Sequence, residues 1–182
     1  MYQLLEYIWL DGNKDFPQLR SKTKVLHELE PLEKLENIPI WNFDGSSTKQ
    51  AETDWSDKIL KPVCMISDPI RGKPNKLVLC EVLNKDGFPH DSNRRSQLCL
   101  SAEKYKEAEP LFGIEQEYTL FDKTGLKPYA WPKKGAPAPQ GPYYCGVGAD
   151  KIYGRELVEA HLKACLEAGL AIAGINSEVM PG

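Results

Sequence analysis

Short apolar runs separated by turn sequences fill the first half of the chain, and this pattern constrains the fold most strongly. Gln3–Leu10 alternates well enough to predict a β-strand, and it ends at the turn dipeptide Asp11-Gly12. Further strands are predicted over residues 23–29, 63–67 and 76–82. The turn-rich segment 69–75 joins the last two as a hairpin, and 84–87 closes the unit. The first half is therefore predicted to form a small β-sheet domain.

The second half has a different pattern. Residues 93–109 are polar and predict a helix that ends before Pro110, and 127–144 holds five prolines, which excludes a helix or a central strand. A loop of that length is often functional. Residues 154–169 carry an apolar stripe at helical spacing, which includes His161 as a packed residue, and Gly169 is placed to cap this helix. With strands predicted over 113–121 and 171–179, the order suggests the beginning of an α+β or α/β layer.

Composition excludes several classes of protein. The net charge is −3 and the basic runs are only pairs, so no nucleic-acid patch is predicted. The five cysteines show no Cys-x-x-Cys spacing, which favours reduced core residues over a disulfide framework or a zinc knuckle. The apolar N-terminus is short, contains Glu6 and lacks a positive leader, and no apolar run approaches the roughly 20 residues of a membrane span. The expected compartment is the cytoplasm, without membrane association.

Acidic residues mark a candidate metal site. Glu115 and Glu117 would share one face of the strand predicted over 113–121, about 6.8 Å apart along it. Two such carboxylates can bind one Mg²⁺ or Mn²⁺ ion, or two ions about 3.5–4 Å apart. Spacing alone favours the alternative, a solvated strand face. Glu178 becomes a third ligand if the strand predicted over 171–179 lies alongside.

Asp44 lies in the turn sequence Asn-Phe-Asp-Gly-Ser-Ser-Thr at 42–48, where hydroxyls can bond nearby backbone groups. It is either part of an ordinary turn or a ligand or base at a loop tip. Composition does not choose between the two.

Taken in order, six blocks of sequence resemble glutamine synthetase of the type found in eukaryotes and some bacteria (type II). They are Glu-Tyr-Ile-Trp-Leu-Asp-Gly at 6–12, Asn-Phe-Asp-Gly-Ser-Ser-Thr at 42–48, Pro-Asn-Lys-Leu-Val-Leu-Cys-Glu-Val at 74–82, Phe-Gly-Ile-Glu-Gln-Glu-Tyr-Thr at 112–119, Pro-Gln-Gly-Pro-Tyr-Tyr-Cys-Gly-Val-Gly at 139–148 and Gly-Ile-Asn-Ser-Glu-Val-Met-Pro at 174–181. The resemblance covers nearly the whole chain. It implies an α+β fold with an N-terminal β-grasp domain over 2–86, followed by the first part of the catalytic domain over 90–182.

The resemblance also implies a reaction and its residues. ATP would phosphorylate the side-chain carboxylate of glutamate, and ammonia would displace phosphate to give glutamine, with Mg²⁺ or Mn²⁺ neutralising charge. Glu115 resembles a ligand of the metal nearer the nucleotide, and Glu117 and Glu178 resemble ligands of the metal nearer glutamate. Asp44 matches the acid that attracts ammonium and helps to deprotonate it, reaching the site of a neighbouring subunit in a homo-oligomer of stacked rings. Trp131 resembles a residue near the adenine.

The sequence also departs from the family. Thr53 stands where relatives usually have glycine, and the family continues past Gly182 with a further metal-ligating glutamate and the arginines that grip phosphate. The chain alone is therefore expected to be inactive and to aggregate or oligomerise. The alternative is a truncated, non-catalytic paralogue that associates with or regulates a full-length synthetase. A relative that ligates another amine is a third possibility, although the match around Asp44 favours ammonia.

Overall fold

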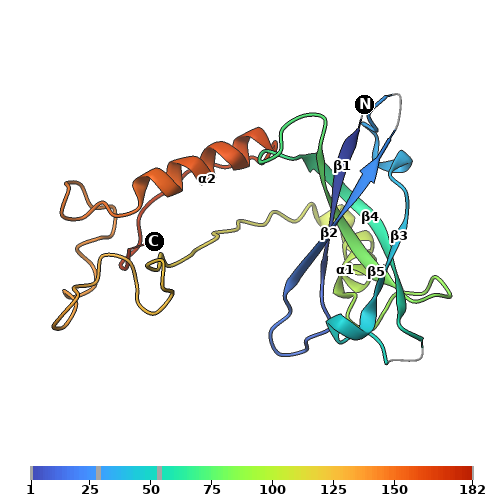
Figure 1. The fold of residues 1–182 in the computed structure, drawn as a ribbon, viewed down its shortest axis with the longest axis horizontal. Coiled ribbons are helices and arrows are strands. Elements are labelled where there is room, and N and C mark those ends of the chain that lie inside the picture. The colour runs from blue at the N-terminus through green and yellow to red at the C-terminus, as the bar shows by residue number, and fades with distance from the viewer. Residues whose placement is uncertain (1, 28–29, 53–54, 182) are drawn as a thin grey trace. The chain divides into compact units, whose positions relative to one another are not determined.

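The computed structural model describes residues 2–27, 30–52 and 55–181, and Thr53 therefore lies outside the described residues. The chain separates into two compact units, Met1–Leu111 and Phe112–Gly182, each considered by itself below. The first unit holds a β-sheet and helix α1 (Arg94–Lys104), and the second holds helix α2 (Arg155–Glu167) among irregular segments (Figure 1). This is an α+β fold, as predicted. The two compact units divide after Leu111. The predicted domain ranges, 2–86 and 90–182, stay predictions.

A five-stranded mixed sheet forms the first unit, with strand order β2-β1-β5-β4-β3 (Figure 1). The strands are β1 (Gln3–Leu10), β2 (Leu19–Leu26), β3 (Trp41–Asp44), β4 (Asp57–Ser67) and β5 (Lys76–Leu83). β1 pairs with β5 in parallel, and every other neighbouring pair is antiparallel. A mixed sheet of this kind agrees with the N-terminal β-grasp domain that the sequence resemblance implies.

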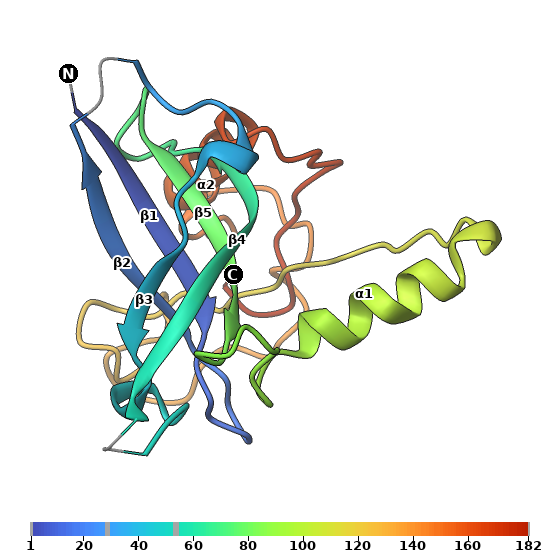
Figure 2. The same ribbon diagram turned by 90° about the vertical axis from the view of Figure 1, so that its right-hand side faces the viewer.

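The sheet curls so that its two edge strands approach each other (Figure 1 and Figure 2). Lys22 of β2 donates from Nζ to the carbonyl oxygen of Asn42 in β3 at 2.9 Å, although these strands stand at opposite ends of the strand order. The same ammonium lies 3.7 Å from the centroid of the Trp41 ring. Lysine on an edge strand also discourages pairing with another chain.

Alternate residues of the strands fill the core inside this curl. The buried apolar side chains are Leu5, Tyr7, Trp9, Leu26, Ile38, Phe43, Leu60, Val78, Cys80 and Val82. In β1 the buried positions alternate strictly, as the sequence pattern predicted. Burial raises the pKa of the Cys80 thiol to about 12, so this thiol is inert. The prediction that most cysteines are core residues is wrong, because Cys64, Cys99 and Cys145 are exposed.

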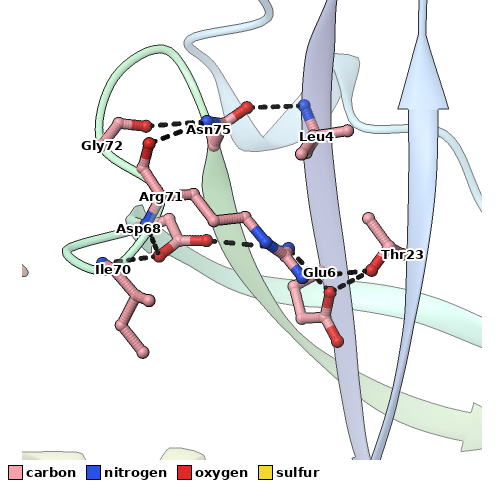
Figure 3. A network of polar contacts seen from close by, with 8 residues as sticks. All are labelled: Leu4, Glu6, Thr23, Asp68, Ile70, Arg71, Gly72 and Asn75. Carbon is pink, nitrogen blue, oxygen red and sulfur yellow. Dashed lines mark hydrogen bonds and ion pairs between the residues drawn. The ribbon is translucent and has the colours of Figure 1, made fainter.

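Polar side chains fix the hairpin between β4 and β5 against β1 (Figure 3). Asn75 accepts the backbone N–H of Leu4 at 2.8 Å and donates from Nδ2 to the carbonyl of Gly72 at 2.9 Å. Arg71 Nη1 lies 2.8 Å from Glu6 Oε2, which also joins the hairpin to β1. These bonds join the hairpin turn to β1, beside which β5 pairs in parallel.

Most strand predictions in the first half are confirmed. Gln3–Leu10 matches β1. The predicted strand 63–67 forms the second half of β4, and the predicted strand 76–82 covers nearly all of β5. The strand predicted over 23–29 begins earlier, at Leu19, and ends at Leu26, while residues 28–29 lie outside the described part. β3 was not predicted, because four residues with a single buried side chain show no recognisable alternation.

The two strands predicted in the second half are wrong. Residues 112–181, all of them described, contain no strand, and only an isolated bridge joins Phe121 to Pro128. A strand requires a hydrogen-bonded neighbour. Here Leu120 donates its backbone N–H to the carbonyl oxygen of Pro181 at 2.9 Å, and Pro181 lies beyond the second predicted segment. The two segments alternate in sequence like strands, but in the described part of this unit neither has a neighbouring strand to pair with.

Helix α2 confirms the prediction over 154–169, with a defined C-terminal end. The N–H of Leu170 bonds the carbonyl of Cys165, and that of Gly169 bonds the carbonyl of Leu166, both at 3.0 Å. These are the two bonds of a Schellman motif, which needs the positive φ that Gly169 adopts, +86°. The helix buries none of its residues, and His161 is exposed with Nδ1 3.3 Å from the Tyr118 hydroxyl, so it is not a packed residue.

The prediction of a helix over 93–109 holds for Arg94–Lys104, after which the chain forms only a short 3-10 turn. Among the described residues, neither α1 nor α2 is long and apolar enough to cross a membrane.

Candidate functional site

Asp44 is the last residue of β3 and the N-cap of a 3-10 turn over Gly45–Thr48. Its Oδ1 accepts the backbone N–H of Ser46 at 2.9 Å and the Ser46 hydroxyl at 2.6 Å. An aspartate in this position satisfies a backbone donor that the short helix leaves free. The side chain is exposed, so the carboxylate is both the cap of the turn and accessible to a ligand.

Local hydrogen bonds favour the ionised form of Asp44. The side chain and the backbone N–H of Ser46, more than any other groups, hold the pKa of this carboxyl below its usual value. The strand register places Asp57 of β4 directly opposite Asp44. Two acidic residues side by side at this end of the sheet produce a negative potential that attracts cations.

The turn that carries Asp44 is held by bonds on several sides. Gly45 donates its N–H to the Ser56 carbonyl at 2.7 Å and accepts that of Gln50 at 2.8 Å. Gly12, two residues after the end of β1, donates its N–H to the carbonyl of Thr48 at 2.8 Å. We define residues 44–50 as the Asp44 turn. Its backbone is positioned by β1 and β4 as well as by its own bonds.

Replacing Gly12 with alanine should destabilise this arrangement by about 3 kcal/mol, the upper part of the usual range for overpacking. A Cβ at this position would lie 2.2 Å from the carbonyl oxygen of Lys49, a backbone atom that cannot move without displacing the turn. Urea unfolding followed by circular dichroism measures the change. Gly174→Ala is the control, because its Cβ would meet nothing within 4 Å. Equal stability of the two variants would contradict the proposed close packing.

A chain of polar side chains extends from the Asp44 turn to residues just before α1. Gln50, only 3% exposed, donates from Nε2 to the Ser92 hydroxyl at 2.9 Å. The Ser92 hydroxyl lies 2.9 Å from Nδ1 of His90, which also accepts the backbone N–H of Ser92 at 3.1 Å. Because Nδ1 accepts that N–H, it carries no proton here. Burial, followed by the charge of Lys58, lowers the pKa of His90 and outweighs opposing effects of the Gln50 backbone and Asp91.

Acidification through the histidine range should therefore weaken the fold. The pKa of His90 is lower in the folded than in the unfolded state, so its contribution is complete above about pH 6.5 and is lost as the pH falls toward the folded value. Between about pH 7 and about pH 5, His90→Gln should lose less stability than the parent, because it lacks the titrating imidazole. Most carboxylates titrate at lower pH and contribute little over this range. His27→Gln, which replaces an exposed histidine, should behave like the parent. Identical pH dependence in all three proteins would contradict a neutral His90.

The three acids predicted as metal ligands all lie in the second unit. Glu115 and Glu117 are exposed on the segment that forms no strand, so the argument that they share a strand face fails. Glu178 is half-buried, and its Oε1 accepts Asn176 Nδ2 at 3.0 Å. Within the described ranges, no group of three or more His, Cys, Asp or Glu residues is gathered as a metal site. The ligand assignment therefore stays a prediction.

The Glu178 segment is nevertheless held in place by the loop rich in prolines. Cys145 donates its N–H to the Ser177 carbonyl at 3.0 Å, and the Ser177 hydroxyl donates to the Tyr143 carbonyl at 2.8 Å. Trp131 of the same loop is half-buried, and its backbone N–H donates to the carbonyl of Pro128 at 3.3 Å. Its predicted role near an adenine is not tested by these contacts.

Sequence reasoning missed the residues that support Asp44. Gly12 was recognised only as part of a turn, and Gln50, Ser92 and His90 were not recognised at all. Gln50 lies 42 residues from its partner Ser92, and no local pattern reports such a bond. The one available signal was the amide side chain of Gln50, two residues after the hydroxyl-rich run 46–48.

Comparison with known proteins adds independent information. Residues 1–85 match the family described as glutamine synthetase, beta-Grasp domain. The chain is 60% identical over 177 residues to a glutamine synthetase of Streptomyces viridochromogenes, with 97% of this chain and 50% of that protein aligned. It is 54% identical over 178 residues to a glutamine synthetase of Tuber borchii, covering 98% and 48% of the two chains. A protein of Chlamydomonas reinhardtii named chloroplastic glutamine synthetase is 51% identical over 185 residues, covering 97% and 48%. The chain spans about half the length of these relatives.

Proposed function

Because this chain belongs to the glutamine synthetase family, we propose that its residues serve the ATP-dependent ligation of ammonia to glutamate. The observation that carries the proposal is the 60% identity over 177 residues, which runs through both compact units. In the proposed reaction the γ-phosphoryl group of ATP passes to the side-chain carboxylate of glutamate and ADP leaves. Ammonia then attacks the acyl carbon, and phosphate departs to leave the amide of glutamine.

Asp44 is proposed to attract ammonium and to take up a proton as ammonia is released for attack. Its exposed carboxylate and the neighbouring Asp57 support the first role, because both favour a small cation. The lowered pKa of Asp44 makes it a weak base. Electrostatic attraction is therefore the larger part of the proposed role, and the proton passes on to solvent.

The donor set of the second unit fits a hard divalent cation in its chemistry. Glu115, Glu117 and Glu178 would supply carboxylate oxygens to Mg²⁺ or Mn²⁺, which prefer such ligands. When bound, these ions neutralise the charge that develops during phosphoryl transfer. Trp131 is proposed to lie near the adenine of ATP. A homo-oligomer of stacked rings, in which Asp44 serves a neighbouring subunit, and a cytoplasmic location belong to the same proposal.

A hybrid enzyme tests the proposal. Residues 1–181 of this chain would replace the aligned half of the Streptomyces relative, and glutamine formation would be measured with ATP, glutamate and ammonium. Turnover comparable to that of the relative is expected, as is a loss of about 100-fold or more with Glu117→Gln. A hybrid that folds and assembles like the relative but forms no glutamine would overturn the proposal. Faster product formation with methylamine than with ammonium would instead indicate ligation of another amine.

A further inference from the structure

Gln50 occupies a position where three parts of the first unit meet. Its side-chain Nε2 donates to the Leu10 carbonyl at 3.1 Å and to the Ser92 hydroxyl at 2.9 Å. Its Oε1 accepts the hydroxyl of Thr48 at 2.8 Å. The amide thus joins the end of β1, the Asp44 turn and the segment before α1. Both of its N–H donors are used.

A buried amide of this kind determines geometry more than it adds stability. Gln50 is 3% exposed, and a buried polar group that lost its partners would carry a large desolvation cost. Its three partners must therefore keep the positions that satisfy it. Apolar packing tolerates small displacements, whereas a fully bonded amide allows only a narrow range of arrangements.

The bonds of Gln50 act directly on the residues that orient Asp44. The backbone N–H of Gln50 bonds the carbonyl of Gly45, the residue after Asp44. The Thr48 hydroxyl, which donates to Gln50 Oε1, also lies 3.2 Å from the carbonyl oxygen of Gly45. A displaced Gln50 would therefore move Gly45, and with it the Ser46 donors that bond the Asp44 carboxylate.

The direction of the hydrogen bonds is fixed as far as His90. Its Nδ1 accepts the backbone N–H of Ser92, so the Ser92 hydroxyl donates its hydrogen to this nitrogen and accepts from Gln50. Ser92 is thus a defined acceptor for Gln50. Because the amide nitrogen of Gln50 faces Ser92, its oxygen Oε1 faces Thr48, as observed.

We infer that Gln50 is a positioning residue for Asp44: through Thr48, Leu10 and Ser92 it holds the Asp44 turn in the form that presents the carboxylate. The inference rests on the function proposed for Asp44, and it deepens that proposal by naming what fixes the ammonium-binding group. Gln50 touches no reacting group itself.

Nuclear magnetic resonance of the 182-residue chain tests the inference without any assay of activity. Gln50→Met keeps the length of the side chain but removes its three hydrogen bonds, and Gln97→Met changes an exposed glutamine of α1 in the same way. Gln50→Met should speed amide exchange at Gly12 and Ala51 relative to Val78, and should raise the measured pKa of Asp44 toward that of a free aspartate. A purely structural role would lower stability without moving this pKa. Ser92→Ala, which removes one partner only, serves if Gln50→Met does not fold.

The hybrid enzyme supplies the functional readout. Gln50→Met should lower kcat/KM for ammonium by about 10- to 100-fold, because a small misplacement of an active-site group has effects of that size. The KM for ATP should stay within about twofold of that of the unchanged hybrid. An equal loss toward ATP and ammonium would indicate general damage to the enzyme instead. Gln97→Met should match the unchanged hybrid.

Each result bears on one of the two proposals. Unchanged amide exchange and an unchanged Asp44 pKa in both Gln50→Met and Ser92→Ala would overturn the positioning role, as would equal losses toward ammonium and ATP. If the unchanged hybrid itself is inactive, the proposed function fails. The resonance experiments on the chain then still decide whether Gln50 orders the Asp44 turn.

Discussion

Replacing Asp44 with asparagine in the hybrid enzyme is expected to lower turnover at limiting ammonium by about 100-fold or more, the scale of a lost acid–base group. The substitution removes a negative charge and a proton acceptor but keeps the shape of the side chain. Asparagine caps a helix as well as aspartate does, so the bond from Ser46 N survives and the turn still folds. The loss should therefore appear in the reaction and leave stability nearly unchanged.

A matched variant isolates this effect. Asp86 is also exposed, and its Oδ1 accepts a backbone N–H two residues further on, that of Phe88 at 3.1 Å, as Asp44 does from Ser46. Asp86→Asn should keep the activity of the hybrid. Initial rates over a range of ammonium concentrations, together with thermal unfolding, give both quantities. If Asp44→Asn retains full activity at limiting ammonium, the role proposed for Asp44 is wrong.

Leu60→Ala is expected to destabilise the chain by about 3 kcal/mol, within the range measured for buried leucines. Leu60 is fully buried in β4, where it pairs with Trp41 of β3 on one side and Val82 of β5 on the other. Truncation removes apolar contacts and leaves a cavity that neighbours on three paired strands cannot readily collapse to fill. Such a loss is a large part of the total stability of a small domain.

Leu79 of β5 provides the comparison, since 42% of its surface is exposed in the same sheet. Leu79→Ala should cost less than about 1 kcal/mol, because much less apolar surface returns to water. Urea unfolding monitored by Trp fluorescence measures both variants. A similar loss for the two substitutions would contradict the position of Leu60 at the centre of the core.

Elements that carry a clear residue pattern of their own were predictable from sequence. β1 was predicted at its observed bounds because each second residue must be buried, and the β4–β5 hairpin followed from the turn residues between two apolar runs. Helix α2 ends at Gly169 for a reason that also lies within a few residues, the positive φ of a Schellman motif. In each case the deciding signal is a pattern of residues within the element or its adjoining turn.

Elements without such a pattern, or whose pattern finds no pairing partner in the fold, were not predicted correctly. β3 is a strand only because β4 pairs with it, and the segment with Glu115 and Glu117 alternates like a strand but has no neighbour to bond. The arrangement of those two carboxylates on one face depended on that missing pairing. Their predicted role as ligands depends on family resemblance and not on spacing.

The sequence by itself determined which residue types are present for the proposed chemistry: the turn around Asp44, the acids of the second unit and the resemblance on which their proposed roles rest. Only the tertiary structure decided how Asp44 is held. Gln50 bonds Leu10 and Ser92, which lie 40 and 42 residues away along the chain. Hydrogen bonds over such separations form only after the strands have assembled, so no local pattern of residues could have specified them.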